Sequence, residues 1–301
     1  MRRILVIGLV FIPLVARAAN VTVNCNLPAP LGKINTVLKY LNPAGPNTIT
    51  VIGTCKENVY IQGFDRLSLV AKPGAVITDA SGGQQYAVIQ INDSRRISIQ
   101  GFTISGGNAG VACYDYSLCR FVSNTITGTA QRGVDIADSD VTFSGDIINN
   151  NTGYGVYATR AHIVATNLTL QANMNGLTLF TGTLVGTGWS VLNNQQDAIF
   201  VGGANFQLID SNVSSNGWNG IDANGMVNLS LENNTVTGNG SDGVFVGDSS
   251  FAWFSGGSYM GNRILDIGCG QNYSLAQNIG GLYGTTNCLN TPAVAAQVQA
   301  K

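Results

Sequence analysis

Four ionisable residues stand at a spacing that repeats along the chain. Asp138 and Arg160 are 22 residues apart, and the same interval separates Asp140 from His162, which is the only histidine. If one turn of the fold takes this number of residues, the four side chains lie together on two adjacent turns. A carboxylate can raise the pKa of a neighbouring imidazole and an arginine can neutralise an anion, so the group suits acid–base catalysis. The alternative is that Asp–Arg and Asp–His pairs only tie one turn to the next.

Further carboxylates stand close to this group in register. Asp115 precedes Asp138 by 23 residues, and Asp135 lies three residues before Asp138. Oxygen-rich clusters of this kind bind hard cations such as Ca²⁺. Calcium is therefore the one ion that the sequence suggests, and no other cofactor is indicated.

A column of aromatic and acidic residues is a second candidate site. Aromatic faces give sugar rings an apolar platform and polar groups fix their hydroxyls, so the column predicts a carbohydrate-contacting face. Alternatively, its phenylalanines pack beneath a long turn or stabilise the sheet as neighbours. Its two carboxylates are four turns apart, roughly 19 Å at the usual inter-strand spacing, which is too far for a glycosidase pair. The residues of the column are Asp135, Tyr157, Phe200, Asp222 and Phe245.

The elements that position these residues repeat with a period of 21 to 23 residues. Each repeat restarts at a glycine or alanine and continues with three short alternating apolar runs, which predict three strands. Three inward columns in each turn specify a parallel β-helix of about eight or nine turns, and the general preference for right-handed crossovers favours that hand. The restarts are Gly110, Gly133, Gly155, Gly176, Ala198, Gly220 and Gly243.

Asparagines form a polar column, and two caps complete a single predicted domain. The asparagines suit tight turns, because their side chains hydrogen-bond the backbone and they tolerate left-handed conformations. Residues 33–41 have a helical apolar spacing, and a solenoid needs its end strands covered, so residues 19–57 are predicted as an N-terminal helical cap. Residues 58–267 form the β-helix, and residues 268–301, where the period breaks, form a C-terminal cap and tail. The asparagines are Asn151, Asn173, Asn194, Asn216, Asn239 and Asn262.

The N-terminus and the cysteines predict export. Residues 1–18 have two arginines near the start, continue with an apolar run and end in the triplet Ala16-Arg17-Ala18, which is typical of a signal peptide cleaved after Ala18. No later run is long enough for a membrane helix. Six cysteines in an exported chain predict three disulfides, making the protein secreted or periplasmic, and proximity favours the pairs Cys25–Cys55, Cys113–Cys119 and Cys269–Cys288.

The charge of the chain excludes one class of partner. Without residues 1–18, 12 basic side chains face 16 acidic ones, a net charge of −4, and no basic stripe is present. A nucleic-acid partner is therefore not expected.

The repeat resembles that of the right-handed parallel β-helix superfamily, the pectin-lyase-like proteins. Residues 233–246, NNTVTGNGSDGVFV, show the pattern, and the likeness covers roughly residues 60–265. The resemblance implies the fold but no single activity, because the superfamily includes lyases, hydrolases, esterases, epimerases and tailspikes. The Gly-His-Gly and Asp-Pro-His-Asp motifs expected of polygalacturonase-like hydrolases and alginate epimerase relatives are absent.

Two functions remain open on this evidence. The first is a secreted, non-catalytic β-helix that binds or presents at extracellular or cell-envelope polysaccharide through the aromatic and acidic column. The second is a polysaccharide lyase or glycoside hydrolase, most plausibly a lyase, that uses His162 or Arg160 with Asp138 and Asp140. The oligomeric state is left open.

Overall fold

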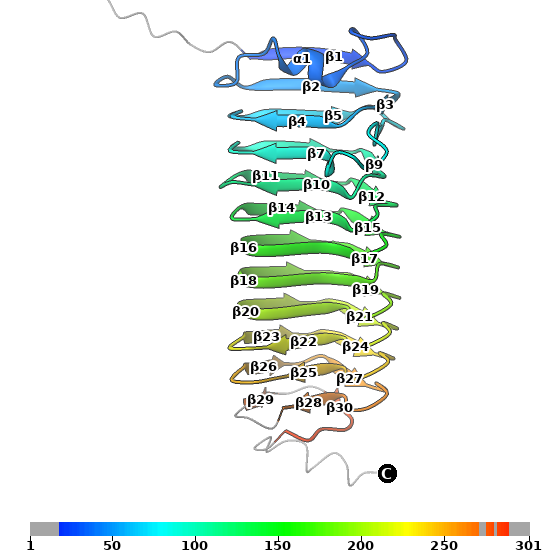
Figure 1. The fold of residues 1–301 in the computed structure, drawn as a ribbon. Helices are drawn as coiled ribbons and strands as arrows, with labels where there is room; N and C mark the ends of the chain where they lie inside the picture. Colours follow the sequence, from blue (N-terminus) through cyan, green and yellow to red (C-terminus); the bar gives the residue numbers. More distant parts are fainter. Residues whose placement is uncertain (1–17, 271–274, 280–281, 289–301) are drawn as a thin grey trace, which may run out of the picture.

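The chain winds into a rod of stacked coils (Figure 1), in a computed structural model that describes residues 18–270, 275–279 and 282–288. Each coil contributes a strand to each of three faces, and every strand pairs in parallel with its counterpart one coil away. The third face alone stacks eleven strands in the described part of the chain, so the rod is longer than the eight or nine turns predicted. The predicted signal peptide, apart from Ala18, lies outside the described residues.

The strands are grouped here by face. The first face contains β4 (Val59–Gln62), β7 (Ala87–Asn92), β10 (Ala109–Tyr114), β13 (Arg132–Ala137), β22 (Ile221–Asn224), β25 (Val244–Val246) and β28 (Ile267–Cys269). The second face contains β1 (Ala19–Asn24), β2 (Asn47–Ile52), β5 (Leu67–Ala71), β8 (Ile97–Gln100), β11 (Leu118–Val122), β14 (Asp140–Ser144), β23 (Asn228–Glu232), β26 (Phe251–Ser255) and β29 (Leu275–Ile279). Three long strands run through both faces: β16 (Tyr154–Thr166), β18 (Asn175–Thr187) and β20 (Ile199–Ile209). The third face contains β3 (Thr54–Lys56), β6 (Val76–Thr78), β9 (Thr103–Ser105), β12 (Thr125–Thr127), β15 (Ile147–Asn149), β17 (Thr169–Gln171), β19 (Ser190–Leu192), β21 (Asn212–Ser214), β24 (Thr235–Thr237), β27 (Ser258–Met260) and β30 (Leu282–Tyr283).

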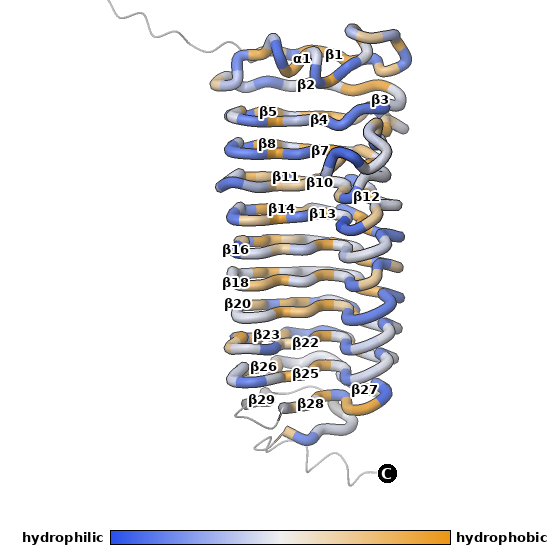
Figure 2. Tube along the Cα trace, viewed as in Figure 1, coloured by the Kyte–Doolittle hydropathy of each residue, from blue (hydrophilic) through white to orange (hydrophobic). Residues whose placement is uncertain are grey.

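The core consists of the inward columns that the sequence predicts. Alternate residues of each strand point inward, so hydrophobic and hydrophilic residues alternate along the coils (Figure 2). On the first face the pairs Val134 with Ile136 and Val156 with Ala158 are fully buried and in register. The third face gives the predicted column: Ile104, Ile126, Ile148, Leu170, Val191, Val213 and Val236 are all fully buried.

The asparagine column forms a buried hydrogen-bonded ladder between the third and first faces. Asn194 shows the pattern: its Oδ1 accepts from the backbone N–H of Asn173 at 3.0 Å and from the Asn173 Nδ2, and its own Nδ2 donates to Asn216 Oδ1 at 2.9 Å. The next coil's backbone and the ladder together account for the glycine restarts. A Cβ at Gly155 would lie 2.5 Å from the Gly176 carbonyl oxygen and 2.8 Å from Asn173 Nδ2, and one at Gly220 would lie 2.8 Å from Asn239 Nδ2. A larger side chain at these restarts would collide with the ladder.

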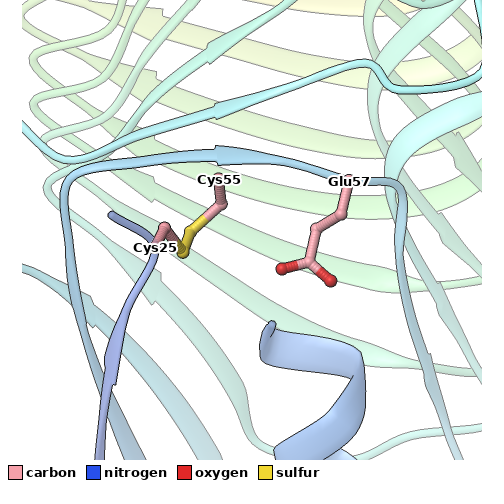
Figure 3. A group of neighbouring side chains, drawn as sticks. All are labelled: Cys25, Cys55 and Glu57. Carbon is pink, nitrogen blue, oxygen red and sulfur yellow. A yellow bond between two sulfur atoms is a disulfide. The ribbon is translucent and has the colours of Figure 1, made fainter. Parts of the chain in front are cut away.

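The N-terminal cap is smaller than the predicted helical segment. Helix α1 (Ile34–Leu38) has only five residues and contacts β1 and β4. The carboxylate of Glu57 points toward this helix (Figure 3) and accepts from the backbone N–H groups of Ile34 at 2.7 Å and Asn35 at 3.2 Å. β1 already pairs in parallel with β2, and β2 with β5, so regular stacking starts well before residue 58.

The C-terminal part also continues the stack. β28 pairs with β25 and β29 with β26, so the coil arrangement extends beyond residue 267. Residues 271–274, 280–281 and 289–301 of the predicted C-terminal cap and tail lie outside the described residues. The three disulfides join Cys25 to Cys55, Cys113 to Cys119 and Cys269 to Cys288, which confirms the pairing that sequence proximity favours.

Candidate functional site

The four clustered residues occupy two adjacent coils, and they divide into two pairs. Asp138 and Arg160 stand at the corner between the first and second faces, both in left-handed turn conformation with φ of 50° and 48°. Arg160 Nε donates to Asp138 Oδ1 at 2.6 Å, and its Nη2 donates to Oδ2 at 2.7 Å. The guanidinium of Arg160 holds the pKa of Asp138 below its ordinary value. The two side chains therefore bind each other and face the solvent.

Asp140 and His162 begin the second face on neighbouring coils. They are register partners in β14 and β16, and both side chains are exposed. His162 Nδ1 hydrogen-bonds Thr183 Oγ1 on the next coil, which orients the imidazole ring. The Asp140 carboxylate makes no hydrogen bond to the described residues, so it is free to accept one from a ligand.

A groove of about 490 Å³ runs across the second face at this point. Its lining includes Asp140 and His162 together with Arg96, Arg120 and the exposed apolar side chains of Leu118 and Val164. Asp138 and Arg160 do not line it. The volume is within the usual range for a ligand site, and its walls combine charged and apolar groups.

The two arginines of the groove differ in their charge partners. Arg96 donates to both carboxylate oxygens of Asp65, at 2.6 Å each from Nη2. Arg120 is exposed and forms no ion pair or hydrogen bond through its side chain with any described residue. Arg120 is therefore the uncompensated cation of the groove.

Sequence reasoning did not select Arg120, Leu118 or Val164. A signal was available in the alternation of the strand: Cys119 and Phe121 are buried, so the residues between and beside them point outward. The register confirms this arrangement, because Leu118 pairs with Asp140 and Arg120 with Thr142.

Asp135 is buried, which corrects the expectation that it lies exposed on a sugar-contacting face. Only 3% of its surface is exposed. Its Oδ2 accepts from the hydroxyls of Tyr86 and Tyr114 and from Arg132 Nη1, the last at 2.6 Å. Burial first, and then the Asp135 carboxylate, raise the pKa of Tyr86 to about 12 and raise that of Tyr114 as well. These contacts make Asp135 the centre of a structural network.

The aromatic members of the first-face column stand on every second coil and are partly covered. The guanidinium of Arg132 lies 3.8 Å over the ring of Tyr157, and Phe180 bridges Tyr157 and Phe200 with centroid distances of 6.1 and 5.4 Å. Tyr157 and Phe200 are half-buried, whereas Phe180, which the sequence did not single out, is 40% exposed. Phe245 lies two coils beyond Phe200 and is also half-buried.

Asp222 lies between Phe200 and Phe245 in the same column, and its hydrogen-bond partners differ from those of Asp135. Burial, followed by repulsion from Asp197, raises the pKa of Asp222 to about 6. Its Oδ2 accepts from Asn219 Nδ2 at 3.3 Å. The register places Asp135 and Asp222 four coils apart, as predicted, so they do not act as a carboxylate pair.

The predicted calcium ligands do not gather at one point. Asp115 accepts from Asn92 Nδ2 at 2.6 Å, Asp138 binds Arg160, and Asp135 lies within its tyrosine network. In the described residues, the one group of three potential metal-ligating side chains within 4.8 Å is Cys25, Cys55 and Glu57 (Figure 3). The sulfurs are joined in a disulfide and the carboxylate caps α1, so this group holds no ion.

Comparisons with known proteins identify the fold. Residues 47–196 match the family model described as the right handed beta helix region. Pectate lyase Pel9A has a similar structure, with a TM-score of 0.54, 13% identity and coverage of 91% of this chain and 78% of that chain. The enzymatically active domain of bacteriophage CBA120 tailspike protein 2 gives a TM-score of 0.52 and 14% identity, with coverage of 88% of this chain and 45% of that chain. The Dettilon tailspike protein gives 0.51 and 13%, with coverage of 86% and 62%.

At these identities the likeness concerns the fold alone. No curated protein matches the sequence. In the described residues, no helix has the length and apolar character needed to cross a bilayer.

Proposed function

We propose that this right-handed parallel β-helix of the pectin-lyase-like fold is an exported protein that binds an acidic polysaccharide in the groove of its second face, without cleaving it. The observation that carries the proposal is the exposed and unpaired Arg120 in a groove that also has apolar walls. Three disulfides support export, because such bonds persist in oxidising compartments.

The groove offers complementary contacts to a uronate residue. The guanidinium of Arg120 can hold a carboxylate through two parallel hydrogen bonds. Leu118 and Val164, 39% and 37% exposed, provide apolar surface for a sugar ring. Asp140 can accept a hydrogen bond from a sugar hydroxyl. The name of the pectate lyase with a similar structure refers to an acidic polysaccharide, which supports this ligand class.

The aromatic column of the first face is the weaker contact surface. Asp135 is enclosed, and Arg132 already covers one face of the Tyr157 ring. Phe180 leaves its ring most open to a ligand there.

The test compares two arginine variants with the same loss of charge. Arg120→Gln is expected to weaken binding of labelled oligogalacturonides about tenfold in a titration, since a charged hydrogen bond contributes roughly 1.5–3 kcal/mol. Arg263→Gln, which alters an exposed arginine outside the groove, is expected to leave the affinity unchanged. Equal affinities of both variants and the parent protein would reject the groove as the binding site.

Lyase-like cleavage is a second candidate function, favoured by the presence of Arg120, Asp140 and His162 in one groove. Proton abstraction needs a base within hydrogen-bond reach of the sugar, and both Asp140 and His162 face the groove. Incubation with pectin, alginate or glycosaminoglycans would then produce unsaturated uronate, measured by its absorbance. Loss of that product in His162→Ala would establish catalysis and overturn the non-catalytic proposal.

A further inference from the structure

Two neighbouring cavities lie on the N-terminal coils, outside the groove. One, of about 360 Å³, is lined by residues that include Lys33, Lys39 and Lys56. The other, of about 500 Å³, extends along β4 to Tyr60. The cavities share four lining residues, which are Asn35, Lys39, Asn58 and Gln85. They therefore form one elongated depression.

The carboxylates of this region are already fully engaged by the protein. Both oxygens of Glu57 accept from the backbone at the start of α1. Asp79 Oδ1 accepts from Ser81 Oγ at 2.7 Å and from Asn58 Nδ2 at 2.8 Å, and its Oδ2 accepts from the Gly83 N–H at 2.8 Å. Although burial acts in the opposite direction, these hydrogen bonds lower the pKa of Asp79 to about 2.

The amide oxygens of the shared asparagines are engaged in the same way. Asn35 Oδ1 accepts from the Tyr60 N–H at 3.1 Å, and Asn58 Oδ1 accepts from the Ala80 N–H at 3.0 Å. These two amide oxygens are thus directed at the protein's own backbone. They hold α1, β4 and the turn at residues 79–83 in fixed relative positions.

The unengaged charged groups of the depression are donors. Lys39 and Lys56 are exposed, and their ammonium groups form no ion pair or hydrogen bond with the described residues. Lys33 Nζ donates to the Lys56 carbonyl at 2.7 Å, which leaves two of its three donors for a ligand. The side-chain amide of Gln85 has no hydrogen-bond partner among the described residues. A ligand that fits here must bring acceptors, and three ammonium groups favour negative charge.

An aromatic ring borders the depression on β4. Tyr60 is 48% exposed, and its hydroxyl donates to Gln62 Oε1 at 2.9 Å, which fixes the ring beside the cavity. Such a ring offers an apolar face to the CH groups of a sugar.

We infer that this depression is a second binding site, for an anionic oligosaccharide. Acidic groups of the ligand pair with Lys33, Lys39 and Lys56, Gln85 donates to a ring or hydroxyl oxygen, and one sugar lies against Tyr60. The site is separate from the groove and does not depend on Arg120, so this inference can be tested independently of the proposed function.

The experiment measures binding to the intact protein by fluorescence titration. The probes are a labelled oligogalacturonide, a heparin oligosaccharide, a neutral oligosaccharide of the same length and an oligothymidylate. Each is tested on Lys39→Gln/Lys56→Gln and on Lys72→Gln, all in an Arg120→Gln background that removes the groove's cation. Lys72 is an exposed lysine outside both cavities and serves as the charge control.

The double variant is expected to lose about tenfold in affinity for at least one anionic oligosaccharide, and Lys72→Gln less than twofold. The neutral oligosaccharide should bind far more weakly than the anionic ones. Added salt should weaken the binding of an anionic oligosaccharide to the parent more than its binding to the double variant. The inference would be overturned if neither anionic oligosaccharide bound, or if the double variant and Lys72→Gln lost equal affinity. Tighter binding of the oligothymidylate than of the anionic oligosaccharides would also overturn it.

Discussion

Two aspartates in one column show how differently the same register position can be used. Asp135 receives hydrogen bonds from two tyrosines and an arginine, and is almost completely buried. Asp222, four coils away, receives one long hydrogen bond from an amide and faces the repulsion of Asp197. The periodic sequence places both side chains outward, but their neighbours decide which hydrogen bonds each carboxylate accepts.

Replacement of Asp135 by alanine is expected to destabilise the fold by about 3 kcal/mol or more, because Arg132 and two tyrosine hydroxyls lose their shared buried acceptor. The midpoint of urea unfolding measures the effect. Asp140→Ala removes an exposed carboxylate without a partner and serves as the matched control, with no expected change. A similar loss of unfolding free energy in both variants would contradict the structural role assigned to Asp135.

The unfolding free energy should depend on pH through Asp222. Its pKa is raised from 3.8 to about 6 in the folded state, so the folded protein binds this proton more tightly than the unfolded chain. Ionisation of Asp222 therefore costs stability at neutral pH, and this cost disappears as the pH falls through 6 toward 4. Asp222→Asn should be more stable than the parent at pH 7 by roughly 2–3 kcal/mol, and the difference should vanish near pH 4.

Urea unfolding of the parent, Asp222→Asn and the exposed control Asp248→Asn at several pH values checks this prediction. A constant difference between Asp222→Asn and the parent at every pH would show that the carboxylate titrates normally in the folded state.

At the scale of elements, turn residues hold successive coils in register. The asparagine ladder bonds each coil to the next through side-chain amides, and the glycine restarts leave room for it. At the opposite corner, Asp115, Asp138 and Arg160 all adopt positive φ, which explains why their spacing follows the period so closely. The ion pair between Asp138 and Arg160 is a consequence of that shared turn conformation.

Removal of one member of the ladder should be costly. Asn194→Ala leaves the buried backbone N–H of Asn173 without a partner and removes one hydrogen bond from each of the neighbouring amides of Asn173 and Asn216, so a loss of about 2–4 kcal/mol in unfolding free energy is expected. Asn205→Ala, which affects an exposed amide pair with Asn228, should change it little. Comparable denaturation midpoints for the two variants would argue against a stabilising ladder.

At the scale of the whole molecule, the rod is a one-dimensional stack in which each coil contacts its neighbours. Its ends are reinforced: Cys25–Cys55 ties the first strand to the third-face strand β3, and Cys269–Cys288 ties β28 to the last described residues. Loss of an end restraint should therefore open coils near that end before those in the middle.

The Cys25→Ala/Cys55→Ala variant is expected to lose more stability than Cys113→Ala/Cys119→Ala. The first disulfide spans 30 residues and the second only 6, and loop-closure entropy gives about 3.6 and about 2.2 kcal/mol respectively. Hydrogen exchange should show faster exchange in β1 and β2 of the first variant, with β18 and β20 still protected. Uniform acceleration along the rod would refute this local opening.

The amino-acid sequence was sufficient to predict the β-helix, its inward columns, the asparagine ladder, the disulfide pairs and the proximity of Asp138 to Arg160. Each of these features repeats with the coil or joins residues that are close in the sequence, so the 22-residue period is enough to predict it. Which outward side chains are accessible to a ligand became evident only from the folded coils. Tyr86 reaches Asp135 from two coils away, and Arg120 lies unpaired between Ser98 and Thr142. Such contacts depend on turns of unequal length and on neighbouring side chains, and neither follows the period.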